Sequence, residues 1–180
     1  VDLVSEPSHY IASRVFDNIY DCRLDIRDFY KLDLLVKEVK PDFVFSLAAQ
    51  SLVRASYENP LDTMTINAIG TANLLEAIRS LDKKVVAIMI TSDKAYDNVE
   101  GAWGYRETDR LGGKDPYSAS KGMAELAIRT FFESFFNKSD SNVRLGIARA
   151  GNVIGGGDWA IDRIVPDCMN AWSNNEIVDI

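Results

Sequence analysis

Three side chains that could carry out chemistry follow one another at the end of an apolar run. The run continues from Met89 to the hydroxyl of Ser92, the carboxylate of Asp93 and the amine of Lys94. A hydroxyl can hold a substrate oxygen, while a carboxylate and an amine can give and take protons. A lysine acts as a base only where burial or a neighbouring cation favours its neutral form. The stretch therefore indicates acid–base chemistry, with a pair of surface charges after a strand as the alternative.

A tyrosine and a lysine further along the chain could form a second reactive group. Tyr117 and Lys121 stand four positions apart, and this spacing places both side chains on one face of a helix. A nearby ammonium stabilises a phenolate, so such a tyrosine can remove a proton from an alcohol at neutral pH. The same spacing also arises by chance, and the alternative is a solvated face of the helix.

The elements that would position these groups alternate between helix and strand. The predicted helices span residues 32–39, 60–81 and 117–136, and the predicted strands span 43–49, 85–90 and 143–148. Alternating apolar runs and helical patterns of these lengths predict an α/β fold with a doubly wound parallel sheet. Ligands of such sheets bind just beyond the carboxyl ends of the strands, which is where Ser92 and its neighbours lie. The polar loop 99–115 is long enough to act as a lid.

Composition and charge exclude several classes of protein. With 47% hydrophobic and 26% charged residues, the chain is typical of a globular domain. Its net charge of −7 without any basic block argues against nucleic acid or an anionic membrane as the main partner. No apolar run approaches the length of a membrane span, and residues 1–20 lack the apolar block of a signal peptide. We therefore expect a cytoplasmic protein.

Cysteine and histidine are too few for a disulfide framework or a metal site. Cys22 and Cys168 lie far apart without the spacing of metal ligands, and His9 is the single histidine of the chain. The chain opens on Val1 rather than Met and ends in a strand-like run. We therefore interpret it as a segment of a longer protein.

The sequence resembles the extended, nucleotide-sugar branch of the short-chain dehydrogenase/reductase superfamily. The resemblance covers most of residues 25–170 and rests on FSLAAQSLVRASYENP, NAIGTANLLEAIR, TSDKAYDN, YSASK and RAGNVIGGGDW. Within this branch, the stretches SDKAYDN, WGYRE, DPYSASKG and AGNVIGGGDWA are most similar to the CDP-glucose 4,6-dehydratases. The resemblance implies NAD as cofactor, CDP-glucose as substrate and an internally redox-neutral loss of water.

The resemblance also implies roles for the reactive residues. Tyr117 would take the proton of the sugar C4 hydroxyl during hydride transfer to NAD, with Ser92 bonded to the same oxygen and Lys121 stabilising the phenolate. The resulting 4-ketone acidifies the C5 hydrogen, so water can leave across C5 and C6 before the hydride returns to C6. Our hypothesis is that Asp93 serves the C6 hydroxyl and Lys94 serves C5. The dTDP-glucose relatives carry Glu in place of Lys94, so the assignment of acid and base stays open.

The resemblance further implies binding residues, domains and a partner. The cofactor side would comprise Asp25, Ile26, Leu47, Ala48, Ala49, Asn67, Tyr117 and Lys121, and the substrate side would comprise Gln50, Ser51, Arg54, Asn152, Arg163 and Pro166. Residues 1–150 would form part of a dinucleotide-binding Rossmann domain without its first strand and glycine-rich turn, and 151–180 would start the substrate-binding region. The helices at 60–81 and 117–136 would pair in a homodimer.

Three alternatives share many of these features. An epimerase or decarboxylase of the same superfamily would keep Ser92, Tyr117 and Lys121 but would not need the Asp93 and Lys94 pair. A dTDP- or GDP-sugar dehydratase would differ in how it recognises the base. A non-enzymatic member would bind NAD or a nucleotide sugar without releasing water, although the intact Ser, Tyr and Lys argue against it.

Overall fold

The structure is a computed structural model that describes residues 8–160 and 162–178. The chain forms two compact units. The sheet unit comprises Leu24–Gly151, and the terminal unit joins the N-terminal segment up to Arg23 with the segment that begins at Asn152. Each unit is described by itself below.

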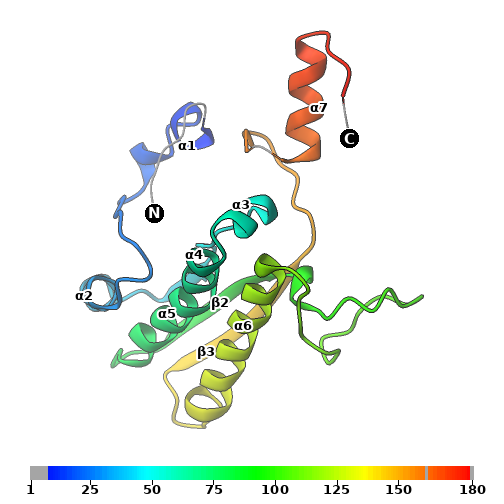
Figure 1. Ribbon diagram of the computed structural model, residues 1–180. Helices are drawn as coiled ribbons and strands as arrows, with labels where there is room; N and C mark the ends of the chain where they lie inside the picture. The colour runs from blue at the N-terminus through cyan, green and yellow to red at the C-terminus, as the bar shows by residue number, and fades with distance from the viewer. Residues whose placement is uncertain (1–7, 161, 179–180) are drawn as a thin grey trace. The chain divides into compact units, whose positions relative to one another are not determined.

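Three parallel strands form the centre of the sheet unit (Figure 1). They are β1 (Phe43–Ser46), β2 (Val85–Ser92) and β3 (Val143–Ala150), in the order β1-β2-β3. Because all three run in one direction, their carboxyl ends meet at the same edge of the sheet. The parallel α/β architecture that the sequence predicts is confirmed.

Helices connect these strands. In the sheet unit they are α2 (Phe29–Val39), α3 (Val53–Glu58), α4 (Pro60–Met64), α5 (Gly70–Arg79) and α6 (Pro116–Phe131). A π-helical turn, η2 (Thr65–Ile69), joins α4 to α5, and a second, η4 (Phe132–Phe136), follows α6. A 3-10 turn, η3 (Asp93–Ala95), directly follows β2. The helices predicted at 60–81 and 117–136 are therefore present, but each contains a π turn that periodicity does not reveal.

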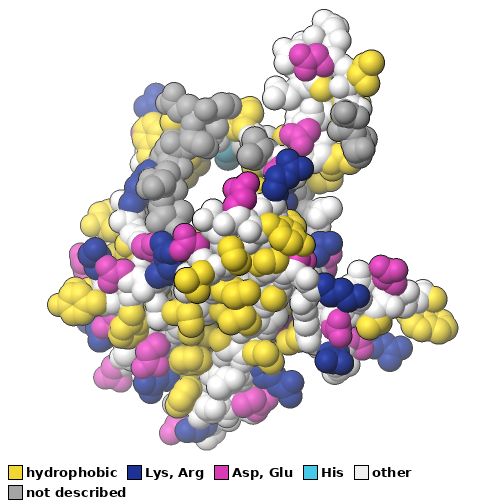
Figure 2. Space-filling view, viewed as in Figure 1, with side chains coloured by type: hydrophobic (Ala, Val, Ile, Leu, Met, Phe, Trp, Pro, Cys, Tyr) yellow, Lys and Arg dark blue, Asp and Glu magenta, His cyan; other side chains and the backbone are white. Residues whose placement is uncertain are grey.

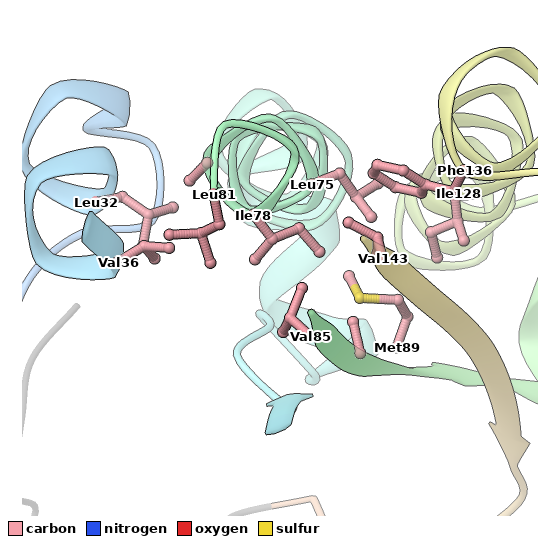
Figure 3. Packing of buried hydrophobic residues seen from close by; sticks show 12 residues of the cluster. Leu32, Val36, Leu75, Ile78, Leu81, Val85, Met89, Ile128, Phe136 and Val143 are labelled. Atoms are coloured by element: carbon pink, nitrogen blue, oxygen red, sulfur yellow. The ribbon is translucent and has the colours of Figure 1, made fainter. Parts of the chain in front are cut away.

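The hydrophobic core lies between one face of the sheet and α2, α5 and α6 (Figure 3). Alternate residues of β2, among them Val85 and Met89, point into this core because successive side chains of a strand face opposite sides. Leu75 and Ile78 from α5 and Ile128 from α6 cover them, each at most 1% exposed. Although β2 is apolar along most of its length, only every second residue of the strand faces this core.

The other face of the sheet carries apolar side chains that the described residues do not cover. Phe43 and Phe45 on β1 are 65% and 63% exposed, and their register partners on β2 are Val86 and Ile88. Helices of the described chain pack on one face only, whereas an apolar strand of this kind is typical of a sheet with both faces buried.

The terminal unit is helical. It contains α1 (His9–Ala12), the 3-10 turn η1 (Val15–Asn18) and α7 (Ile164–Ser173). Gly157 adopts a φ of +79°, and a Cβ at this position would lie 2.2 Å from Nδ1 of His9. Glycine is therefore required there both by the backbone conformation and by the close approach of the histidine. Within the described ranges of both units, no helix is long and apolar enough to cross a membrane.

Candidate functional site

The helix α6 brings Tyr117 and Lys121 together inside the sheet unit. Asp115 caps the helix by accepting a hydrogen bond from the Ser118 backbone N–H at 2.9 Å, and Pro116 occupies the first turn. Tyr117 and Lys121 are only 8% and 7% exposed, and Nζ of Lys121 lies 5.9 Å from the centre of the Tyr117 ring. The pair is therefore not a solvated face of the helix.

Burial sets the electrostatics of this pair. It lowers the pKa of the Lys121 ammonium below its usual value, because the charged form loses water. Among the residues that the structure describes, none supplies a carboxylate to this ammonium. A buried cation beside a tyrosine ring is suited to hold hydroxyl groups of a ligand and to stabilise a phenolate.

The turn η3 holds the second group of reactive side chains against the same helix. The Ser92 hydroxyl donates to Oδ1 of Asp93 at 3.0 Å and accepts from the backbone N–H of Lys94 at 3.2 Å. A Cβ at Gly122 would lie 3.7 Å from the carbonyl oxygen of Ala95, so η3 is close to the turn of α6 that carries Lys121. Asp93 and Lys94 are exposed in the described chain. A pair of surface charges after a strand therefore stays the alternative to a role in acid–base chemistry.

Asn67 connects three segments at this edge of the sheet. It lies in the π turn η2, where it is 1% exposed. Its Oδ1 accepts from the Gln50 backbone N–H at 2.8 Å, and its Nδ2 donates to the Gln50 carbonyl and to Oγ of Ser120. The Ser120 hydroxyl in turn donates to the Tyr117 carbonyl at 2.6 Å. Asn67 therefore holds the segment after β1 against the helix of Tyr117 and Lys121.

The segment after β1 carries the remaining candidates of this unit. Leu47 and Ala48 are exposed and Ala49 is half-buried, so small side chains leave room for a ligand at the end of the strand. Ser51 and Arg54 are also exposed. The Gln50 amide is held within the protein, because its Nε2 donates to Thr63 at 2.9 Å and to the Leu52 carbonyl. Its side chain contributes to the shape of the segment.

Asp25 and Ile26 lie against α5. The Arg27 side chain and backbone N–H hydrogen-bond to the Asp25 carboxylate and lower its pKa to about 2. A Cβ at Gly70 would lie 2.4 Å from Cδ1 of Ile26, and Nδ2 of Asn73 donates to the Ile26 carbonyl at 3.0 Å. The absence of a side chain at Gly70 therefore lets this segment approach the helix.

The other substrate-side candidates belong to the terminal unit. Asn152, Arg163 and Pro166 all line one hollow of about 770 Å³ in that unit. The structure thus groups these three residues together. The remaining candidates belong to the sheet unit, where Asp25 and Ile26 form a group of their own beside Arg27 and α5.

Sequence reasoning missed a buried ion pair beside the turn η3. Glu125 on α6 is 1% exposed, and its carboxylate receives both Nε and Nη2 of Arg149 at 2.8 and 2.9 Å. The sequence feature that could have revealed Glu125 is its spacing from Tyr117 and Lys121, which places an acid on the same face of the helix. Arg149 comes from the end of β3, so only the folded sheet brings it to Glu125.

Comparison with known proteins places this geometry in a family. The family model for GDP-mannose 4,6 dehydratase matches residues 8–142. The curated CDP-glucose 4,6-dehydratase of Salmonella typhimurium is 48% identical over 183 residues, which cover 100% of this chain and 51% of that protein. The chain therefore spans about half the length of this relative.

Solved structures share the fold. MoeE5 in complex with UDP-glucose and NAD is 25% identical with a TM-score of 0.73, over 88% of this chain and 50% of that one. UDP-glucose 4-epimerase of Thermotoga maritima has a TM-score of 0.79 at 24% identity, over 91% of this chain and 52% of that one, and supports the fold alone. Because the family model matches most of the sequence, this chain belongs to the GDP-mannose 4,6-dehydratase family.

Proposed function

We propose that the protein carrying this sequence converts CDP-glucose to CDP-4-keto-6-deoxy-glucose by loss of water, with NAD as cofactor. The observation that supports this most is the buried Tyr117 and Lys121 pair beside the turn of Ser92, Asp93 and Lys94. One group is suited to the oxidation of an alcohol and the other to proton transfers during elimination. The 48% identity to a CDP-glucose 4,6-dehydratase supports the choice of substrate.

The residues around β1 fit a dinucleotide. Ala48 and Ala49 leave space at the strand end, and the buried Lys121 ammonium lacks a carboxylate among the described residues. When bound, NAD accepts a hydride from the sugar and later returns it. We assign its binding to Asp25, Ile26, Leu47, Ala48, Ala49, Tyr117 and Lys121. Asn67 would contribute by holding the segment after β1, because its amide is bonded to Gln50 and Ser120.

The oxidation would use the helix α6. Tyr117, as phenolate, takes the proton of the C4 hydroxyl, and the Ser92 hydroxyl holds the same oxygen. Lys121 stabilises the negative charge of the phenolate before the transfer. The product is a 4-ketone.

The elimination would use the turn η3. A 4-ketone acidifies the adjacent C5–H bond, so Lys94 in its neutral form takes the C5 proton and the electron pair forms the C5–C6 double bond. The C6–O bond breaks, and Asp93 gives its proton to the departing hydroxyl, which leaves as water. The hydrogen bond from Ser92 to Asp93 links this step to the residue that holds the C4 oxygen. C6 would then regain the hydride removed from C4, and Lys94 would return its proton to C5, which completes the 4-keto-6-deoxy sugar.

We propose that Gln50, Ser51 and Arg54 of the sheet unit bind substrate. For the terminal unit, we propose the same role for Asn152, Arg163 and Pro166. A division near residue 150 into a dinucleotide-binding part and the start of a substrate-binding part is consistent with these assignments. Gln50 would contribute through the shape of its segment, because its amide is held by Thr63 and Leu52.

A homodimer through α4, α5 and α6 is also part of the proposal. Figure 2 shows hydrophobic side chains gathered over the surface of these helices. Leu61, Ile69, Met123 and Leu126 are apolar residues of this region with exposed fractions of 73%, 51%, 43% and 54%. Contiguous apolar surface on a protein marks an interaction site.

The cytoplasmic location stays a prediction.

The decisive experiment uses the protein expressed with the flanking sequence of its gene. It is incubated with NAD and, separately, with CDP-glucose, dTDP-glucose and GDP-mannose, and the alkali-induced absorbance of a 4-keto-6-deoxy sugar is followed. A signal with CDP-glucose alone is the expected result. A signal with another nucleotide sugar would replace the substrate and keep the reaction. Silence with every sugar, despite measured NAD binding, would favour an epimerase or a binding module.

A further inference from the structure

The buried ion pair of Glu125 and Arg149 is not explained by stability. Its two hydrogen bonds of 2.8 and 2.9 Å form a parallel fork, and the side chains are 1% and 16% exposed. Taking both charges out of water costs free energy that the attraction between them roughly offsets, so apolar residues of similar size would stabilise the fold as well. Glu125 also raises the pKa of the Arg149 guanidinium, which therefore stays charged.

The pair reaches the turn η3 at both of its ends. Immediately before Ser92, the Thr91 hydroxyl donates to Oε1 of Glu125. Immediately after Ala95, the Tyr96 ring lies under the guanidinium of Arg149, with its centre 4.7 Å from Cζ. Thr91, two positions before η3, and Tyr96, the residue directly after it, thus both contact one buried pair.

The same pair also holds the loop that follows η3. Nη1 of Arg149 donates to the Glu107 carbonyl at 3.1 Å. Tyr105 stacks on Tyr96 with ring centres 5.0 Å apart and an angle of 19° between the planes. Since Glu125 comes one helical turn after Lys121, α6 supports the loop and the Tyr117 and Lys121 pair at once.

We propose that Glu125 and Arg149 are positioning residues that hold the turn η3 so that Asp93 and Lys94 meet C5 and C6 of the sugar. This inference rests on the proposed dehydration. Tyr117 and Lys121 are placed by α6 itself, whereas Asp93 and Lys94 are exposed residues of a short turn. Loss of the pair should therefore slow the elimination more than the oxidation.

The test is Arg149→Lys, which keeps the charge but loses the fork and the planar contact with Tyr96. A displacement of about 1 Å at reacting groups can cost about 100-fold, so we expect kcat to fall about 10- to 100-fold. KM for the nucleotide sugar should change less than about twofold. In a single turnover, the absorbance of reduced cofactor should persist longer, because oxidation proceeds while elimination is delayed.

Arg79→Lys is the matched control. Arg79 forms a similar fork with Glu76, with Nε 2.7 Å from Oε2, and its Cζ lies 4.9 Å from the Phe135 ring centre. This pair is on the exposed surface of α5, away from η3, so the control should retain kcat within about twofold. Equal slowing of oxidation and elimination in Arg149→Lys would show a general structural role and overturn the proposal, as would an unchanged kcat.

Amide hydrogen exchange separates this inference from the proposed function. If Arg149→Lys does not fold, Tyr96→Leu removes one contact to the pair and leaves its fork intact. In either variant, exchange over residues 92–99 should accelerate roughly tenfold relative to the same residues in Arg79→Lys. Acceleration without any dehydration by the unaltered protein would contradict the proposed function and retain only the role of the pair in holding the turn η3. Unchanged exchange would refute that role.

Discussion

Burial divides the candidate residues into two groups. Tyr117 and Lys121 are enclosed by the protein, whereas Asp93 and Lys94 are exposed on a turn. An alcohol can therefore meet a prepared pair at α6. In the proposed dehydration, the proton transfers at C5 and C6 would depend on groups that a bound substrate must still desolvate.

The role of Lys94 can be tested through hydrogen exchange at C5. If Lys94 is the base, Lys94→Ala should reduce deuterium incorporation from D2O at C5 by about 100-fold or more, because general base catalysis contributes about that much. The measurement is proton NMR of the sugar product. Lys138→Ala, an exposed lysine outside the site, is the control. Undiminished exchange in Lys94→Ala would assign the base to another residue.

The buried Lys121 should make stability depend on pH. Its pKa is lowered in the folded state, so between this pKa and the unfolded value of about 10.4 the unfolded chain binds more protons. The free energy of unfolding should therefore rise with pH across that window. The Lys121→Met variant should be more stable than the unaltered protein at neutral pH. Its free energy of unfolding should lack the increase with pH that the titration of Lys121 causes.

Urea denaturation at several pH values measures the difference between the two proteins, which cancels the titration of other groups. The exposed Lys138→Met should follow the unaltered protein. A constant difference between Lys121→Met and the unaltered protein at all pH values would contradict the lowered pKa.

At the scale of elements, periodicity predicted α2, the α4 to α5 region, α6 and the three strands, but not α1, α3, α7 or the interruptions of the longer helices. The strand predicted at 43–49 ends at Ser46. The strand predicted at 85–90 extends to Ser92, and the helix predicted at 60–81 is divided by the turn η2. Within this turn, Asn67 hydrogen-bonds to Gln50 and Ser120, which are 17 and 53 positions away in the chain. Local patterns carry no information about such partners, and the pair of Glu125 with Arg149 was missed for the same reason.

The cap of α6 is a prediction at this scale. Asp115 accepts from the backbone N–H of Ser118 and from its hydroxyl. Asp115→Ala should lower the free energy of unfolding by about 1 kcal/mol, since the first turn loses its cap. Asp115→Asn should lose much less, because an amide oxygen also caps a helix. Urea denaturation checks both variants, and equal stabilities of the Ala and Asn variants would exclude capping as the cause.

At the scale of the whole molecule, the two apolar surfaces of the sheet unit call for separate explanations. The uncovered sheet face around Phe43 and Phe45 is part of a strand pattern that is typical of burial on both sides. The surface of α4 to α6 includes α5 and α6, whose inner faces are already packed on the sheet. The second surface is therefore the one we assign to a partner.

A charge in the proposed interface should separate the subunits. Leu126→Asp places a carboxylate among apolar side chains on α6, and the cost of burying it should convert a dimer to a monomer. Analytical ultracentrifugation of the protein with its flanking sequence measures this change. Tyr30→Asp, on α2 where the side chain is 70% exposed, is the control and should stay dimeric. A monomeric unaltered protein would refute the interface.

The π turn η2 also sets the phase of the helix that follows it. A π turn contains one residue more than an α-helical turn. This extra residue rotates every later position about the helix axis by about 100°. Deleting Ile66 to restore a continuous α-helix from Pro60 to Arg79 would therefore turn either Leu75 and Ile78 out of the core or Thr63 away from Gln50. The single extra residue therefore lets α4 direct Thr63 toward Gln50 while α5 directs Leu75 and Ile78 into the core.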